Sequence, residues 1–209
     1  MMRRPDMAGA RSFCESLIMT EITTKRHILD AYLALLCSRP LAAISMHDVA
    51  TEADVSLAVL RGTYGSEEAL FDAFAELVDA QVLDRTTDLV IDRPAKDRLF
   101  DVLMTRIGVL TPYQPAIRAL KQAARDNPAL AMLFGQISAR EQSWMLVAAR
   151  IDIRGAAAIN LAQALVLVFA RTVETWLEDP TQDKTLTKTV LQRELEVGAK
   201  WMNDLSLAK

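Results

Sequence analysis

The sequence has few of the residues that build disulfide-linked, metal-binding or redox proteins. Its 209 residues include two cysteines, Cys14 and Cys37, which lack the C-x-x-C spacing of a zinc or redox motif. So few thiols suit a reducing cytosol. We therefore expect a cytoplasmic protein without a disulfide framework, a metal site or a cofactor.

Recognisable catalytic motifs are also absent from the sequence. Its two histidines, His27 and His47, fall on different predicted helices, and there is no Gly-rich phosphate loop, GxSxG elbow or HExxH pair. The remaining enzyme hypothesis is an all-α lyase or isomerase built from scattered carboxylates. We predict no catalytic residues and a protein that is not an enzyme.

Positive charge is scarce relative to negative charge. The chain has 24 Lys and Arg against 27 Asp and Glu, which gives a formal net charge of −3. The field of the whole molecule therefore does not attract nucleic acid or an anionic membrane, and any basic surface must be local. Hydrophobic residues make up 51% of the chain, enough for a sizeable core.

Long uninterrupted apolar runs are missing as well. The longest apolar run, from Gly155 to Ala170, is interrupted by Asn160 and Gln163 and is shorter than the roughly 18 to 20 residues that cross a bilayer. We expect this run to form a buried helix and the protein to have no membrane span.

The apolar residues that are present follow helical spacing, without the alternation of β-strands, and proline or glycine interrupts them at intervals. This pattern predicts an all-α fold of about nine helices. Three short helices before residue 66 would form an amino-terminal helix-turn-helix domain. The rest would form a carboxy-terminal helical bundle, with long helices at about residues 128–151, 156–178 and 184–205.

The segment that begins at Ser45 predicts the helix-turn-helix. Ser45 and Asp48 have the spacing of a capping box, which starts a helix. Asp54 stands in a tight turn and tolerates the left-handed conformation that such turns often need. Ser56 can then cap a further short helix that runs to about Gly62. In a helix-turn-helix, this second helix is presented to the major groove of DNA.

This stretch resembles the amino-terminal signature of the TetR family of bacterial repressors. The matching segments are DVA from Asp48, ADVS from Ala53, AVLR from Ala58 and SEEAL from Ser66, with the family's spacing kept without gaps. The resemblance implies a ligand-responsive transcriptional regulator, a repressor that binds a palindromic operator in double-stranded DNA as a homodimer. It also implies three regions: a flexible arm at 1–22, a DNA-binding domain at 23–65, and a ligand-binding and dimerisation bundle at 66–209.

The predicted DNA-reading segment departs from the family pattern at several positions. Asp54 replaces glycine in the turn, Arg61 replaces the usual tyrosine, and Glu67 replaces a lysine that contacts phosphate. Arg61 is the single cation between Ser45 and Glu68, so phosphate contacts would depend on helix amino termini and on cations elsewhere, such as Lys25 and Arg26. The residues expected to contact DNA are Ser45, His47, Ser56, Leu57, Val59, Arg61 and Thr63.

A second resemblance supports an alternative function. The segment from Asp97 to Leu120 is similar to part of the accessory proteins of coenzyme Q biosynthesis, which share the TetR-like fold. This resemblance implies a lipid-binding accessory protein of quinone biosynthesis, which holds an isoprenoid lipid in its bundle and does not bind DNA.

The predicted bundle is rich in methionine and aromatic residues, which favour an apolar small-molecule or lipid ligand. One polar end of this ligand could be held by Gln136, Arg140, Gln142 or Asn160. The same apolar residues at helical spacing would also make an ordinary core. The candidate lining residues are Met104, Ile107, Leu133, Phe134, Ile137, Trp144 and Phe169.

The last two predicted helices are too apolar to leave a whole face in water. The final helix carries its apolar residues along one side: Leu186, Val190, Val197, Trp201 and Leu205. We expect these two helices to pair with their copies in a homodimer.

Overall fold

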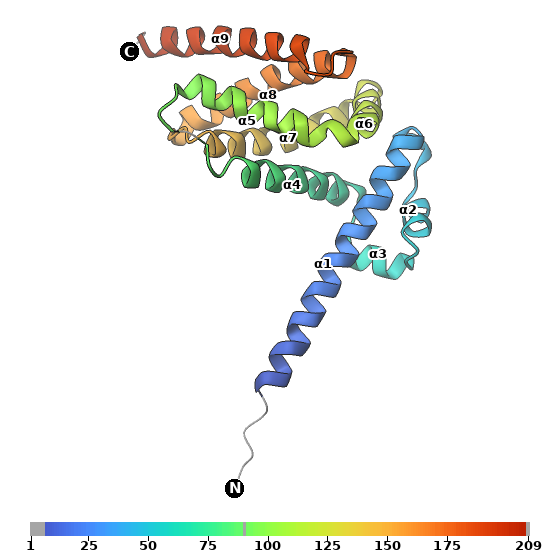
Figure 1. Ribbon diagram of the computed structural model, residues 1–209. Helices are drawn as coiled ribbons and strands as arrows, with labels where there is room; N and C mark the ends of the chain where they lie inside the picture. The colour runs from blue at the N-terminus through green and yellow to red at the C-terminus, as the bar shows by residue number, and fades with distance from the viewer. Residues whose placement is uncertain (1–6, 90, 208–209) are drawn as a thin grey trace. The chain divides into compact units, whose positions relative to one another are not determined.

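The computed structural model describes the backbone of residues 7–89 and 91–207 and the side chains of residues 19–89 and 91–198. Within these ranges the chain forms nine α-helices, two 3-10 turns and no strand (Figure 1). The predicted all-α fold is therefore confirmed. The α-helices are α1 (Met7–Ser38), α2 (Met46–Glu52), α3 (Leu57–Thr63), α4 (Glu67–Arg85), α5 (Ala95–Leu110), α6 (Gln114–Asp126), α7 (Pro128–Ala148), α8 (Gly155–Glu178) and α9 (Thr185–Leu207).

The chain divides into two compact units, residues 1–73 and 74–209. The first holds α1, α2, α3 and the first turns of α4, and the second holds the rest of α4 and the remaining helices. The division falls within α4, somewhat later than the boundary expected after residue 65. Helix α4 is continuous across this division, so a single helix belongs to both units.

Helix α1 is longer than the sequence pattern indicated. We expected a flexible arm at 1–22, but the chain is helical from Met7, and residues 1–6 lie outside the described part. No proline occurs between Pro5 and Pro40, so nothing in this span breaks the helical hydrogen bonding. The ion pair between Glu21 and Lys25, one helical turn apart with 2.9 Å between charged atoms, adds a small local stabilisation.

The core of the first unit forms where α1 meets the two short helices. The apolar face of α1 is buried, with Ile28 fully enclosed, and Val49 of α2 and Leu60 of α3 are buried as well. Tyr64, just after α3, is buried and donates its hydroxyl to the carbonyl of Lys25 at 3.0 Å. This contact ties the end of α3 to α1.

The second unit is built around α5, α7 and α8, which pack against one another, with α9 against α5 and α8 (Figure 1). The inward face of α8 has a regular spacing of three or four residues from Ala162 to Trp176, and Leu177 is buried beside them: Ala162, Leu165, Phe169, Thr172, Trp176 and Leu177. The outward face remains apolar, with Ile159 64% and Leu167 65% exposed. The expectation of a buried helix was therefore wrong for the side of α8 that carries Ile159 and Leu167.

Helix α8 is also longer than the apolar run that predicted it. It has 24 residues and, among the described residues, is the one helix long and apolar enough to cross a membrane by length and composition. The helix continues past Ala170 to Glu178, close to the bounds of about 156–178 that the sequence predicted.

The joint between α8 and α9 is organised by Asp179. One carboxylate oxygen accepts hydrogen bonds from the backbone and hydroxyl of Thr181, at 3.0 and 2.5 Å. The other accepts from the backbone and hydroxyl of Thr187 in α9, at 2.9 and 2.7 Å. Burial alone would raise the pKa of Asp179, but these four hydrogen bonds hold it well below its usual range.

We expect Asp179→Ala to lower the melting temperature, because the donors of Thr181 and Thr187 lose their acceptor. Asp183→Ala is the matched control, since this exposed carboxylate accepts one side-chain bond, from Thr185, in the same loop. A carboxylate with a lowered pKa contributes stability above its unfolded pKa and loses it as the pH falls, so the effect should persist from about pH 7 to about pH 5 and shrink in stronger acid. Equal melting curves for the two variants at neutral pH would contradict this account.

Candidate functional site

The first half of the helix-turn-helix begins with the predicted capping box. The Ser45 hydroxyl accepts from the backbone N–H of Asp48 at 3.2 Å, and the Asp48 carboxylate accepts from the backbone N–H of Ser45 at 2.8 Å. Hydrogen bonds from the Ser45 side chain and then its backbone lower the pKa of Asp48, which therefore carries its charge at neutral pH. This negative charge lies at the start of α2.

The turn between α2 and α3 has the left-handed residue that the sequence predicted. Asp54 has a φ of 48°, in the left-handed region. The N–H of Asp54 bonds to the carbonyl of Thr51 at 3.1 Å, and the N–H of Val55 bonds to that of Ala50 at 3.0 Å. This pair of bonds is a Schellman motif, which ends a helix and turns the chain sharply. Aspartate therefore fills the position that glycine holds in the TetR signature.

Helix α3 presents apolar side chains at the surface of the described part of its unit. The Ser56 hydroxyl caps it by accepting from the N–H of Val59 at 3.2 Å. Leu60 is 1% exposed and anchors the helix, whereas Leu57 is 51% and Val59 is 44% exposed. Exposed apolar side chains beside a buried anchor are the arrangement expected of a helix that contacts another molecule.

The predicted DNA-contact residues fall together on α2 and α3. Six of them are exposed: Ser45, His47, Ser56, Leu57, Val59 and Arg61. The exception is Thr63, which is half-buried and donates its hydroxyl to the carbonyl of Val59 at 2.8 Å. Sequence inspection missed Tyr64, whose buried ring and bond to Lys25 hold the end of this helix in place.

Positive charge near this surface is mostly paired. Lys25 bonds to Glu21 at 2.9 Å, and Arg26 bonds to Asp30 at 2.9 Å. Arg61 is exposed and forms no ion pair within the described part of the chain. The end of its side chain lies next to Gly65, where an added Cβ would be 3.2 Å from Nη1. Arg61 is thus the cation of α3 that is available to a partner.

The predicted lining residues of the bundle are only partly brought together. Ile107, Ile137 and Phe169 are buried, and Met104, Leu133 and Phe134 are half-buried. The assignment of Trp144 was wrong, because its side chain is 52% exposed. Its neighbours Gln142, Met145 and Leu146 take the inward face of α7, and this rotation directs Trp144 outward. Of the four proposed polar residues Gln142 is buried, whereas Gln136, Arg140 and Asn160 are exposed.

The bundle contains a buried ion cluster that sequence inspection did not find. Arg106 of α5 is 2% exposed, and its guanidinium bonds to Asp79 of α4 and, at 2.5 Å, to Glu141 of α7. It also lies over the ring of Phe169 in α8, 5.6 Å from the ring centre. The signal was present in the sequence, since Arg106 falls in the helical register of the apolar residues Leu99, Val102 and Val109.

The two carboxylates of this cluster share one cation. Burial raises the pKa of Asp79, although Arg106 opposes the shift. Burial likewise raises the pKa of Glu141, Arg106 opposes it, and the nearby charge of Asp79 adds to it. The cluster therefore binds protons more readily than free carboxylates do.

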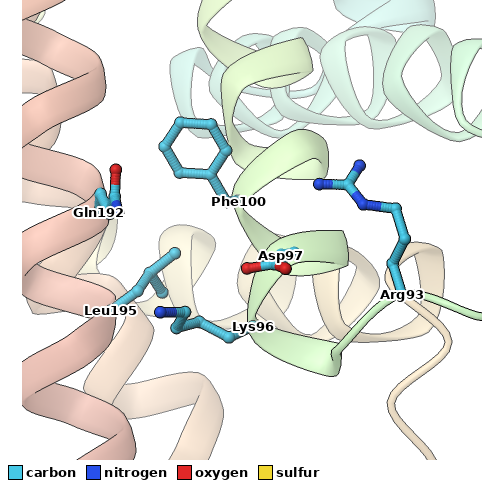
Figure 2. Close-up of a pocket in the computed structure, with 6 residues that line it drawn as sticks. All are labelled: Arg93, Lys96, Asp97, Phe100, Gln192 and Leu195. Carbon is cyan, nitrogen blue, oxygen red and sulfur yellow. The ribbon is translucent and has the colours of Figure 1, made fainter.

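A pocket of about 270 Å³ lies elsewhere in the second unit, between the start of α5 and α9. Figure 2 shows Lys96 and Phe100 of α5 on one side and Gln192 and Leu195 of α9 on the other. The charged groups at this pocket are largely paired, with Lys96 Nζ 3.4 Å from Glu196 and Arg93 bonded to Asp101. None of the seven predicted lining residues borders this pocket.

A helix-turn-helix in the first unit and an all-helical second unit, joined by one continuous α4, define the fold of the TetR-family transcriptional regulators. The chain is similar to the TetR regulator of Nitrosomonas europaea ATCC 19718, with 19% identity over 84% of this chain and 97% of that one and a TM-score of 0.66. A TetR regulator of Rhodococcus sp. RHA1 has 19% identity over 85% and 96% of the two chains and a TM-score of 0.63. The TetR family repressor AlkX of Dietzia sp. strain DQ12-45-1b has 21% identity over 86% and 95%, with a TM-score of 0.54.

No protein-family model matches the sequence, and no curated protein matches it either. The similarity to solved structures therefore establishes the fold.

We expect Arg106→Met to lower the free energy of unfolding by about 3 to 5 kcal/mol, because it leaves Asp79 and Glu141 buried without their cation. Both carboxylates can then escape the penalty by taking up protons, so the loss should be larger at about pH 8 than at about pH 5. Arg154→Met removes an exposed ion pair with Asp152 and should cost about 0 to 1 kcal/mol. Chemical denaturation of the three proteins at both pH values measures this, and a loss independent of pH would contradict the charge account.

Proposed function

We propose that the protein is a ligand-responsive, DNA-binding transcriptional regulator that acts as a repressor and binds a palindromic operator as a dimer. The observation that carries this proposal is α3, which is anchored by Leu60 and presents Leu57, Val59 and Arg61 outward. Such a helix can enter the major groove, where Arg61 can bind guanine through two hydrogen bonds. The TetR fold supports the same reading.

The acidic residues near α3 in the sequence limit which groups could bind the phosphates of DNA. Glu67 is half-buried and accepts from the hydroxyl of Tyr32 at 3.3 Å, so its charge is partly enclosed within the first unit. Glu68 is exposed, and its charge would lie closer to solvent and to DNA. Phosphates would be bound mainly by the backbone N–H groups at the helix starts near Ser45 and Ser56. Because few phosphate charges would be neutralised, we expect modest affinity for duplex DNA, and a larger share of the binding free energy should come from contacts with the bases.

The dimer would form through α8 and α9. Ile159 and Leu167 of α8 and Leu186 and Val197 of α9 are exposed apolar side chains on these two helices. Trp201 and Leu205, which we also expected on this face, lie outside the described side chains. A second copy of the chain would cover this surface, and a bilayer is the rival cover for α8.

The effector would be a mainly apolar small molecule or lipid held in the bundle. Ile107, Ile137 and Phe169 supply a buried apolar surface. AlkX, one of the structural neighbours, is a repressor implicated in biodegradation of n-alkanes, and an effector of comparable apolarity suits these side chains. Binding would act through α4, which belongs to both units, and the coupling between effector and operator must be reciprocal.

The alternative is a lipid-binding accessory protein of quinone biosynthesis that keeps the fold without binding DNA. One observation favours it: between Ser45 and Glu68 the sequence carries five carboxylates and a single cation, Arg61. Recovery of an isoprenoid quinone by solvent extraction of the purified protein, together with an absence of DNA binding, would support this function over the regulator.

We expect Arg61→Ala to weaken binding to the preferred duplex by about 1 to 3 kcal/mol and to relax the sequence preference, because it removes a base contact. Glu68→Lys should strengthen binding to all duplexes and steepen the dependence on salt, because it adds a phosphate contact. Glu68 is chosen over Glu67 because Glu67 accepts the hydrogen bond of Tyr32. Fluorescence anisotropy with preferred and scrambled duplexes separates the effects, and an equal loss on both duplexes in Arg61→Ala would contradict base reading.

We expect Leu167→Glu to convert the dimer to a monomer at micromolar concentration, because it buries a charge in the proposed interface. Met132→Glu on α7 is the matched control, since Met132 is 69% exposed on a helix outside that interface. Sedimentation velocity measures both variants beside the wild type. A monomeric wild type, or a dimer that tolerates Leu167→Glu, would contradict the assignment.

A further inference from the structure

The guanidinium of Arg106 joins four helices of the second unit. Its Nη1 bonds to Asp79 of α4 and lies 3.7 Å from the sulfur of Met145, its Nη2 bonds to Glu141, and its plane covers Phe169 of α8. The third nitrogen, Nε, is buried and has no hydrogen-bond partner. One strong donor of this cluster is therefore unused.

A second unused group belongs to the same region. Gln142 follows Glu141 in α7 and stands three residues before Met145, so it shares the face of α7 that meets Arg106. Its side chain is fully buried, and both its amide nitrogen and its amide oxygen lack a partner within the described residues. Leaving a buried polar group unpaired costs about 1 to 3 kcal/mol, so a partner from outside the chain would bind here with that gain.

We propose that the bundle interior at Arg106 and Gln142 binds a small neutral molecule with an amide-like head and an apolar body. The head would accept hydrogen bonds from Arg106 Nε and the Gln142 amide nitrogen, and donate one to the Gln142 oxygen. The buried side chains of Ile107, Ile137 and Phe169 in the same helices provide apolar contacts for the body.

The groups of this site select against a charged head. Asp79 and Glu141 are two carboxylates against the single cation Arg106, so an anionic head would add a further uncompensated negative charge in the interior. A cationic head such as an ammonium offers donors and no acceptor, so it would leave the N–H groups of Arg106 Nε and of the Gln142 amide unpaired.

The site also has a route to the first unit. Asp79 lies on α4, and the same helix begins at Glu67 in the first unit. A head that bonds to Arg106 Nε acts on the same guanidinium that holds Asp79 through Nη1, and so acts on the attachment of α4 to the bundle. This consequence rests on the proposed regulator function, whereas the binding site itself rests on the bundle alone.

The test measures binding of octanamide, octanoate and octylammonium by isothermal titration calorimetry, with a thermal melt of each protein. We expect octanamide to bind the wild type more tightly than either charged analogue. Gln142→Leu should weaken octanamide binding by about tenfold or more, because it removes the complementary amide. Gln136→Leu is the matched control, an exposed glutamine in the same helix, and should bind octanamide as the wild type does.

The melting temperature separates a binding role from a structural one. Without ligand, Gln142→Leu should melt no lower than the wild type, because it removes two unpaired polar atoms from the interior. A marked fall would show that the amide is satisfied within the folded chain and would overturn the proposal. Tight binding of octanoate or octylammonium, or unchanged binding of octanamide by Gln142→Leu, would overturn it as well.

Failure of the site and failure of the regulator give different results. A protein that binds octanamide through Gln142 and ignores all duplexes keeps the site and loses the regulator function. A protein that selects a palindromic duplex but does not bind octanamide keeps the regulator function and loses the proposed site.

Discussion

The bundle depends on the burial of one guanidinium. Arg106 is almost completely enclosed, and a lone charge there would destabilise the fold by more than one apolar contact could offset. It is tolerated because Asp79, Glu141 and the ring of Phe169 reach it from three other helices. The positions of α4, α5, α7 and α8 within the second unit are therefore constrained together, and a ligand that bonds to this cluster would act on all four.

The helix-turn-helix could be predicted from the sequence because its determinants are local. The Ser45 cap, the left-handed Asp54 and the Ser56 cap each act within a few residues, so short-range rules suffice. The ion cluster could not be derived in the same way, since Asp79 and Glu141 lie far from Arg106 along the chain. A charged residue in an apolar helical register signals a buried charge, but only the packed bundle identifies its partners.

The incorrect expectations have a common physical cause, which is that composition does not fix which way a helix faces. Trp144 lies at helical spacing from buried residues, yet the face of α7 that carries Gln142 and Met145 turns it outward. Helix α8 is apolar on both faces, and its own chain buries one of them. The sequence shows that a residue is apolar, but it does not show whether its own bundle, a second copy of the chain or a ligand covers it.

The helix-turn-helix has the shape of a DNA-reading unit, but carboxylates outnumber cations between Ser45 and Glu68. The proposed regulator function therefore depends on whether base contacts and helix amino termini can offset weak phosphate neutralisation. The most direct measurement is selection from a random duplex library with the purified protein at low salt, followed by sequencing. The proposed function predicts enrichment of a palindrome whose two half-sites are about one helical turn of DNA apart. A library that stays random after repeated rounds, with no binding at physiological salt, would contradict it.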